Sequence, residues 1–156
     1  MTKSIASLLL LAPSVALLVE SAGCACTLVL VYSGTETTLV IAQDAASLDG
    51  AGVRACLDDD CVTADLVTQG GAIFCDGERS SPPFIQCFGE ERAEGLSLQV
   101  SLLIPDGAAE DGDFYEFSVT APGNPGEVLA EREGAVEYET SEPNGTFCGT
   151  VSNAKL

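Results

Sequence analysis

Strict alternation of apolar and polar residues over residues 96–104 is the feature that most constrains the fold. Five apolar side chains, from Leu96 to Ile104, stand at every second position, and Ser and Gln stand at most of the positions between them. A period of two places such a set on one face of a β-strand. The segment is therefore predicted to be a strand with one face in the core and the other face in solvent.

The rest of the chain repeats this pattern in shorter segments bounded by Gly, Pro, Asp and Asn, and helical periodicity is nearly absent. Turn residues recur about every eight to twelve residues, which is typical of sandwiches. We predict an all-β fold: an antiparallel β-sandwich of about eight strands, with a small barrel as the alternative. The expected strands are residues 27–32, 37–42, 52–57, 61–67, 72–75, 84–88, 96–104, 114–120, a hairpin of 127–132 and 135–140, and a closing C-terminal strand.

Residues 1–26 have the layout of an export signal. A positively charged start and an apolar run lead to the small residues Ser-Ala-Gly, which stand directly before Cys24. The run is too short for a stable membrane helix. A cysteine in this position resembles the bacterial lipobox, whose cysteine becomes the lipid-bearing first residue of the mature protein. The resemblance implies a lipoprotein-type signal peptide over residues 1–23 and a single β-sandwich domain over residues 24–156, attached to the membrane through Cys24.

The residue after this cysteine is Ala25, and in the lipoproteins that the motif resembles, a residue other than Asp favours the outer membrane. The alternative is an ordinary signal peptide, cut after Gly23 or Ala25. That cleavage would release a secreted domain that binds a ligand or a carbohydrate.

The cysteine count supports both export and the lipid anchor. The chain has seven cysteines, and exported proteins tend to pair their thiols. If Cys24 carries lipid, six remain to form disulfides. Six cysteines allow 15 pairings, and the scheme favoured by spacing is Cys56–Cys61 across a hairpin, Cys75–Cys87 around a Gly/Ser/Pro-rich loop, and Cys26–Cys148 between the domain ends. The rival interpretation is a metal site built from Cys56, Cys61 and Cys75.

Charge and composition exclude several classes of function. Removal of residues 1–23 leaves 133 residues with 5 basic and 23 acidic side chains. Such an excess of negative charge argues against nucleic-acid binding and against electrostatic attachment to anionic lipid. The chain has no histidine, so it lacks Ser-His and Cys-His catalytic couples and imidazole metal ligands. We therefore expect no enzyme, although catalysis by carboxylates alone stays open.

The acidic segment that follows the 96–104 strand is a candidate calcium site. Its carboxylates are Asp106, Glu110, Asp111 and Asp113, and calcium prefers six to eight oxygen ligands, often from one loop. The segment lacks the register of an EF-hand. The simpler interpretation is a solvated acidic turn, and no other cofactor is expected.

Three stretches of the chain resemble small lipoproteins of myxobacteria. They are the segment from Leu48 to Cys61, the segment Asp111 to Tyr115, and the C-terminal part from Tyr138 through Pro-Asn-Gly-Thr-Phe-Cys-Gly to Leu156. The resemblance implies an immunoglobulin-like β-sandwich and a cell-envelope location, without a reaction. Together with the anchor motif it predicts a lipid-anchored envelope protein that acts as a structural or interaction module, with the membrane and an envelope protein as its partners.

Overall fold

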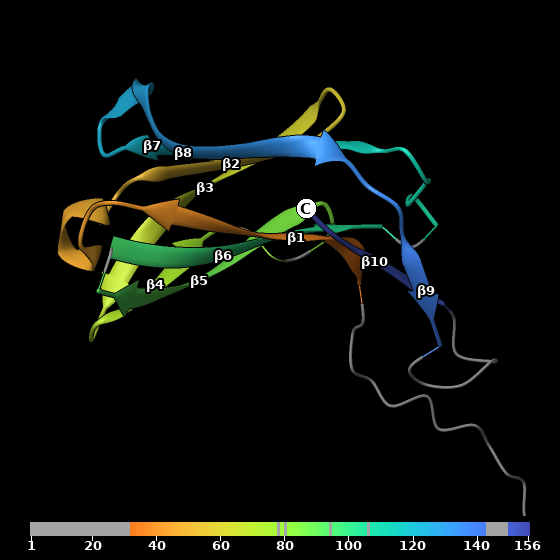
Figure 1. The fold of residues 1–156 in the computed structure, drawn as a ribbon, viewed down its shortest axis with the longest axis horizontal. Helices are drawn as coiled ribbons and strands as arrows, with labels where there is room; N and C mark the ends of the chain where they lie inside the picture. Colours follow the sequence, from red (N-terminus) through yellow and green to blue (C-terminus); the bar gives the residue numbers. More distant parts are fainter. Residues whose placement is uncertain (1–31, 78, 80, 94, 106, 143–149) are drawn as a thin grey trace, which may run out of the picture.

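The structure is a computed structural model that describes residues 32–156 apart from 78, 80, 94, 106 and 143–149. The described residues form an all-β fold with one short 3-10 helix, η1 (Ala45–Leu48), as Figure 1 shows. None of the helical structure in this part is long and apolar enough to cross a membrane. The strands are β1 (Ser33–Ile41), β2 (Gly52–Leu57), β3 (Asp60–Gln69), β4 (Ala72–Asp76), β5 (Phe84–Arg92), β6 (Gly95–Ile104), β7 (Phe114–Ala121), β8 (Asn124–Ala135), β9 (Glu139–Ser141) and β10 (Val151–Lys155).

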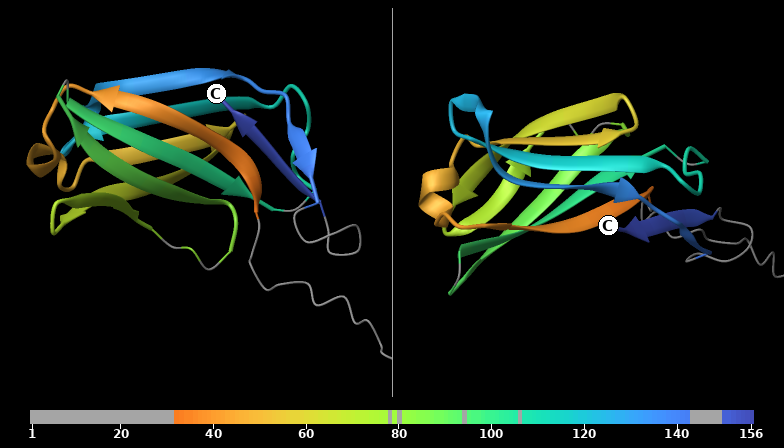
Figure 2. Two further views of the ribbon diagram at one scale, coloured as in Figure 1. Left: turned by 60° about the horizontal axis from the view of Figure 1, so that its bottom comes forward. Right: turned by 45° about the horizontal axis from the view of Figure 1, so that its top comes forward.

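All ten strands belong to one sheet, in the order β8-β7-β2-β3-β4-β5-β6-β1-β10-β9. Neighbouring strands are antiparallel, with one exception: β1 and β10 are parallel. The prediction of a purely antiparallel arrangement is therefore wrong at this pair. The sheet folds over on itself into a sandwich-like body, with β8, β7, β2 and β3 in one layer and β4, β5, β6 and β1 in the other (Figures 1 and 2).

The core lies between these two layers and follows the alternation of the strands. In β6, the five apolar residues from Leu96 to Ile104 are at most 1% exposed, as the sequence pattern predicts. In β7, the inward residues are Tyr115, Phe117 and Val119, all at most 1% exposed. Burial of large side chains of this kind contributes about 1.5–3 kcal/mol each relative to an exposed position.

The first half of β1 lies in the core although it is polar. Ser33, Thr35 and Thr37 are each 2% exposed and pair along β6. The strand expected over residues 37–42 therefore begins earlier than predicted, at Ser33, and ends at Ile41. The β-branched threonines suit a strand, and inward and outward positions alternate from Thr35 to Ile41, after a start at which Ser33, Gly34 and Thr35 are all buried. The strand expected over residues 27–32 falls almost entirely outside the described residues.

The two edges of the sheet are joined by only three residues, 136–138, which connect β8 to β9. Such a link spans at most about 14 Å, so the opposite edges must converge there. The prediction of a hairpin around Glu133-Gly134 is wrong: β8 continues to Ala135, which pairs with Phe114 of β7.

Two disulfides connect strands that are neighbours in the sheet. Cys56 and Cys61 stand directly opposite each other in β2 and β3, with their Cα atoms 4.0 Å apart. Cys75 of β4 and Cys87 of β5 are bonded with a Cα separation of 5.1 Å. These are the same two pairs that the spacing predicts. Cys24, Cys26 and Cys148 lie outside the described residues.

The two disulfides are expected to contribute unequally to stability. The chain-entropy model gives about 3 kcal/mol for the sequence separation of 12 between Cys75 and Cys87, and about 2 kcal/mol for the separation of 5 between Cys56 and Cys61. Urea unfolding of the double variants Cys75→Ala/Cys87→Ala and Cys56→Ala/Cys61→Ala checks this order. A larger loss in the second variant would contradict it.

Candidate functional site

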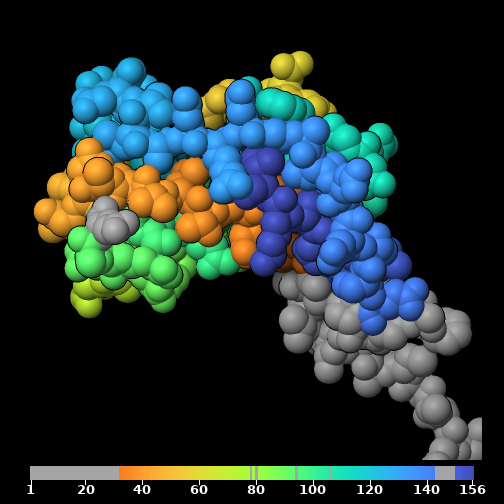
Figure 3. Space-filling model, in the orientation of Figure 1, coloured from red at the N-terminus to blue at the C-terminus, as the bar shows by residue number. Residues whose placement is uncertain are grey.

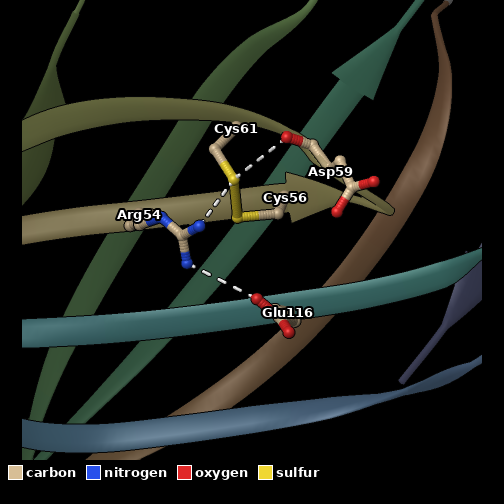
Figure 4. A network of polar contacts seen from close by, with 5 residues as sticks. All are labelled: Arg54, Cys56, Asp59, Cys61 and Glu116. Atoms are coloured by element: carbon tan, nitrogen blue, oxygen red, sulfur yellow. Dashed lines mark hydrogen bonds and ion pairs between the residues drawn. A yellow bond between two sulfur atoms is a disulfide. The ribbon is translucent and has the colours of Figure 1, made fainter.

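The disulfide hairpin of β2 and β3 is covered by an arginine (Figure 4). The Arg54 guanidinium donates to the Sγ atom of Cys61 at 2.7 Å and lies 3.4 Å from the Glu116 carboxylate of β7. The side chains of Arg54 and Glu116 are 48% and 43% exposed, so their ion pair contributes at most about 1 kcal/mol. The cluster therefore stabilises the hairpin.

The acidic loop before β7 is hydrogen-bonded to the link between the two sheet edges. Asp111 Oδ1 accepts a hydrogen bond from the backbone N–H of Tyr138 at 2.9 Å. Asp113 Oδ2 accepts one from the Tyr138 hydroxyl at 3.1 Å and one from the backbone N–H of Glu110 at 3.0 Å. Backbone bonds join the same segments, from Val136 N–H to the Asp113 carbonyl at 3.0 Å and from Gly112 N–H to the Val136 carbonyl at 2.9 Å. The loop therefore holds residues 136–138 in place.

The calcium hypothesis concerns the same loop and stays a prediction. Glu110, Asp111 and Asp113 are described, whereas Asp106 is not. Among the described residues, no three side chains of the metal-binding types form a cluster. Calcium bound here would raise the thermal midpoint relative to a chelator by mass action, and an unchanged midpoint would exclude it.

Two tyrosines meet where this loop reaches the core. The hydroxyl groups of Tyr115 and Tyr138 form a short hydrogen bond, and Tyr138 also donates to Asp113. The buried hydroxyl of Thr35 faces both phenols but makes no well-aligned hydrogen bond with either. The chain Tyr115–Tyr138–Asp113 therefore connects the core to the acidic loop through side-chain hydroxyl groups.

Both tyrosines are hard to ionise in this environment. Burial raises the pKa of Tyr115, mainly because the phenolate would lose its hydration. Burial also raises the pKa of Tyr138 far above its usual value, and the hydrogen bond to Tyr115 adds to this shift. Both groups are protonated in the physiological range, so the pair is suited to a structural role rather than to acid–base chemistry.

Two hollows lie on the outer surface of the layer that contains β1. The larger, about 610 Å³, lies over β6, β1, β10 and β9. The smaller, about 390 Å³, lies over β5, β6 and β1. The carboxylates of Glu137 and Glu139 both line the larger hollow. Other side chains in the two hollows include Glu36, Ser101, Asn153 and Lys155 in the larger, and Thr38, Phe88, Ser97 and Gln99 in the smaller.

The sequence indicates the acidic loop. It does not indicate that the loop is bonded to Tyr138, and it does not indicate the two hollows. The alternation of residues 114–120 places Tyr115 on one face of the predicted strand. Its contact with Tyr138 does not follow from the sequence, because it depends on how the sheet folds over. The comparisons with known proteins do not add a site: no protein family, curated protein or solved structure matches this chain.

Replacement of Tyr138 by Phe is expected to destabilise the protein by about 1–3 kcal/mol. The change leaves the hydroxyl of Tyr115 and one carboxylate oxygen of Asp113 without their shared partner. Urea unfolding measures the loss. Tyr32→Phe is the control, because the Tyr32 ring packs against Phe84, away from this network.

Alkaline pH should weaken the folded state through the same pair. The pKa values of Tyr115 and Tyr138 are raised on folding, so the folded state retains these protons where the unfolded chain loses them. Stability is therefore full below about pH 10 and falls as pH rises beyond the unfolded value. Unfolding free energies measured from neutral to alkaline pH should show this fall, and the slope should be smaller in Tyr138→Phe. A slope identical to that of the wild type would contradict the assignment.

Proposed function

We propose that this protein is a lipid-anchored interaction module of the bacterial cell envelope, without catalytic activity. The observation that carries the proposal is the pair of disulfides in the described domain, combined with a seventh cysteine at a lipobox-like position. Disulfides persist in exported proteins and are rare in the cytosol. If the other six cysteines form three disulfides, Cys24 has no cysteine left to pair with. A thioether bond to a lipid would account for it.

The place where the domain starts fits a short tether. Eight residues, 25–32, separate Cys24 from β1, and they span at most about 32 Å. The end of the domain where β1 begins would therefore face the membrane. The acidic loop before β7 and the β9–β10 pair lie at this end, and η1 and the β7–β8 turn lie at the opposite end (Figure 1).

The features of the domain favour binding over chemistry. The chain has no histidine, and the carboxylates of Asp111 and Asp113 are hydrogen-bonded into the scaffold. Its net charge of −18 keeps the body away from anionic lipid headgroups, so that attachment would depend on the covalent anchor. We propose the outer membrane as the location and an envelope component as the partner.

The anchor predicts a specific mass and a specific effect of one substitution. Protein purified from its native membranes should begin at Cys24, exceed the mass of the polypeptide by its acyl groups, and gain six hydrogens on reduction. It should enter the detergent phase in a phase-partition assay. Cys24→Ala should abolish this partition, because the attachment atom is lost.

Cys26→Ala is the matched control, since it removes a cysteine two residues away and should leave the partition unchanged. A lipid-free mass that begins at Cys24 or Cys26 would contradict the anchor and favour the secreted alternative. Equal loss of partition in both variants would indicate a folding or export defect rather than loss of the lipid.

A further inference from the structure

The outer face of β5, β6 and β1 is turned toward the viewer in the left panel of Figure 2, and the strand register places a strip of outward side chains along it. Strand register places Phe88 opposite Gln99, and Gln99 opposite Thr38. The next row joins Glu90, Ser97 and Val40. We call this strip the outer track, and it comprises Glu36, Thr38 and Val40 of β1, Ser97, Gln99 and Ser101 of β6, and Phe88 and Glu90 of β5.

The outer track combines exposed apolar groups with uncharged polar groups. Val40 is 68% exposed and Phe88 is 53% exposed, and these are the two most exposed large hydrophobic residues in the described part of the chain. Phe74 of β4 extends the apolar surface, because it pairs with Phe88. Between the apolar groups stand the hydroxyl and amide groups of Ser97, Gln99 and Thr38, which both donate and accept hydrogen bonds.

The charges of the outer track are neutralised within the face. Glu36 lies 3.9 Å from Lys155, and Glu90 lies 3.4 Å from Arg92. Beyond residue 23 the chain has only 5 basic residues against 23 acidic ones. Two of these five basic side chains therefore pair with Glu36 and Glu90, the two carboxylates of the outer track, in a protein that is strongly acidic as a whole.

The two hollows lie next to each other along the outer track. The smaller is lined by Thr38, Phe88 and Gln99, and the larger by Glu36 and Ser101, which are the next outward residues on the same two strands. From Val40 to Gly34, β1 covers about 20 Å. The strip is thus elongated and shallow rather than a deep pocket, and it suits a chain-like ligand that lies along the strands.

We infer that the outer track binds a neutral, extended carbohydrate chain. The C–H face of a sugar ring packs on an exposed aromatic ring such as Phe88, and its hydroxyls exchange hydrogen bonds with the amide of Gln99 and with nearby hydroxyls. In the larger hollow, the carboxylates of Glu137 and Glu139 accept hydrogen bonds from further sugar hydroxyls. These carboxylates and the charge of the whole chain repel an anionic polymer.

This inference names a ligand class for the proposed envelope module, and it rests on that proposal for access to carbohydrate outside the cytoplasm. Binding itself does not depend on the lipid. Failure of the anchor would show in the mass and in the detergent partition, whereas failure of the carbohydrate site would show only in binding.

Calorimetric titration of the full-length mature protein in detergent micelles tests the inference. The probes are neutral hexasaccharides with β-1,4-glucose, β-1,3-glucose, β-1,4-mannose and β-1,4-N-acetylglucosamine linkages, with hexagalacturonate as the anionic comparison. At least one neutral probe should bind, and hexagalacturonate should not. Phe88→Ala should weaken binding about tenfold or more, and Gln99→Ala should weaken it as well.

Phe114→Ala is the matched control, because Phe114 is also an exposed phenylalanine, 38% exposed, on β7 in the other layer. It should bind as the wild type does. All the substituted side chains are on the surface, and thermal melts verify that each variant folds. The inference is overturned if no neutral probe binds, or if Phe88→Ala and Phe114→Ala have equal effects. It is also overturned if sedimentation shows a dimer that Phe88→Ala dissociates, since the face would then join two copies of the chain.

Discussion

The three-residue link between β8 and β9 is the constraint on which the rest of the structure depends. These strands are consecutive in the chain, yet they form the two opposite edges of a ten-stranded sheet. A flat sheet would separate them by many strand spacings of about 4.8 Å. The link is possible only because the sheet folds over on itself, and the same folding places the apolar faces of both layers against each other. It also requires β9 and β10 to continue the sheet beside β1, where β10 is parallel.

Polar side chains stabilise this closure at the link between the two edges. Asp111 and Asp113 accept hydrogen bonds from Tyr138, and Tyr138 bonds to Tyr115 in the core. The acidic loop therefore stabilises the link between β8 and β9. Carboxylates that accept several hydrogen bonds have fewer free oxygen sites for a cation, so any calcium at this loop would have to bind beside these contacts or replace them.

The sequence predicted what depends on local periodicity and missed what depends on distant pairing. The strands over residues 96–104 and 114–120 follow from alternation, and the Cys56–Cys61 hairpin follows from the acidic residues Asp58-Asp59-Asp60 between its strands. The start of β1 was not predicted, because Ser33 and Thr35 are polar and are buried only through their pairing with β6. The pairing of β1 with β10 joins residues about 120 positions apart, and no local pattern contains that information.

The same limit explains why the outer track was not visible in the sequence. Val40, Phe88 and Gln99 come from three separate segments, and each alone is an ordinary exposed residue. Only the register brings them to one face, beside the two ion pairs that neutralise it. If the domain is tethered at the start of β1, this face runs from the membrane-facing end along the direction of β1 toward the far end. An extended ligand along the track would then have its length directed away from the membrane, so the short tether and the binding face do not compete for the same surface.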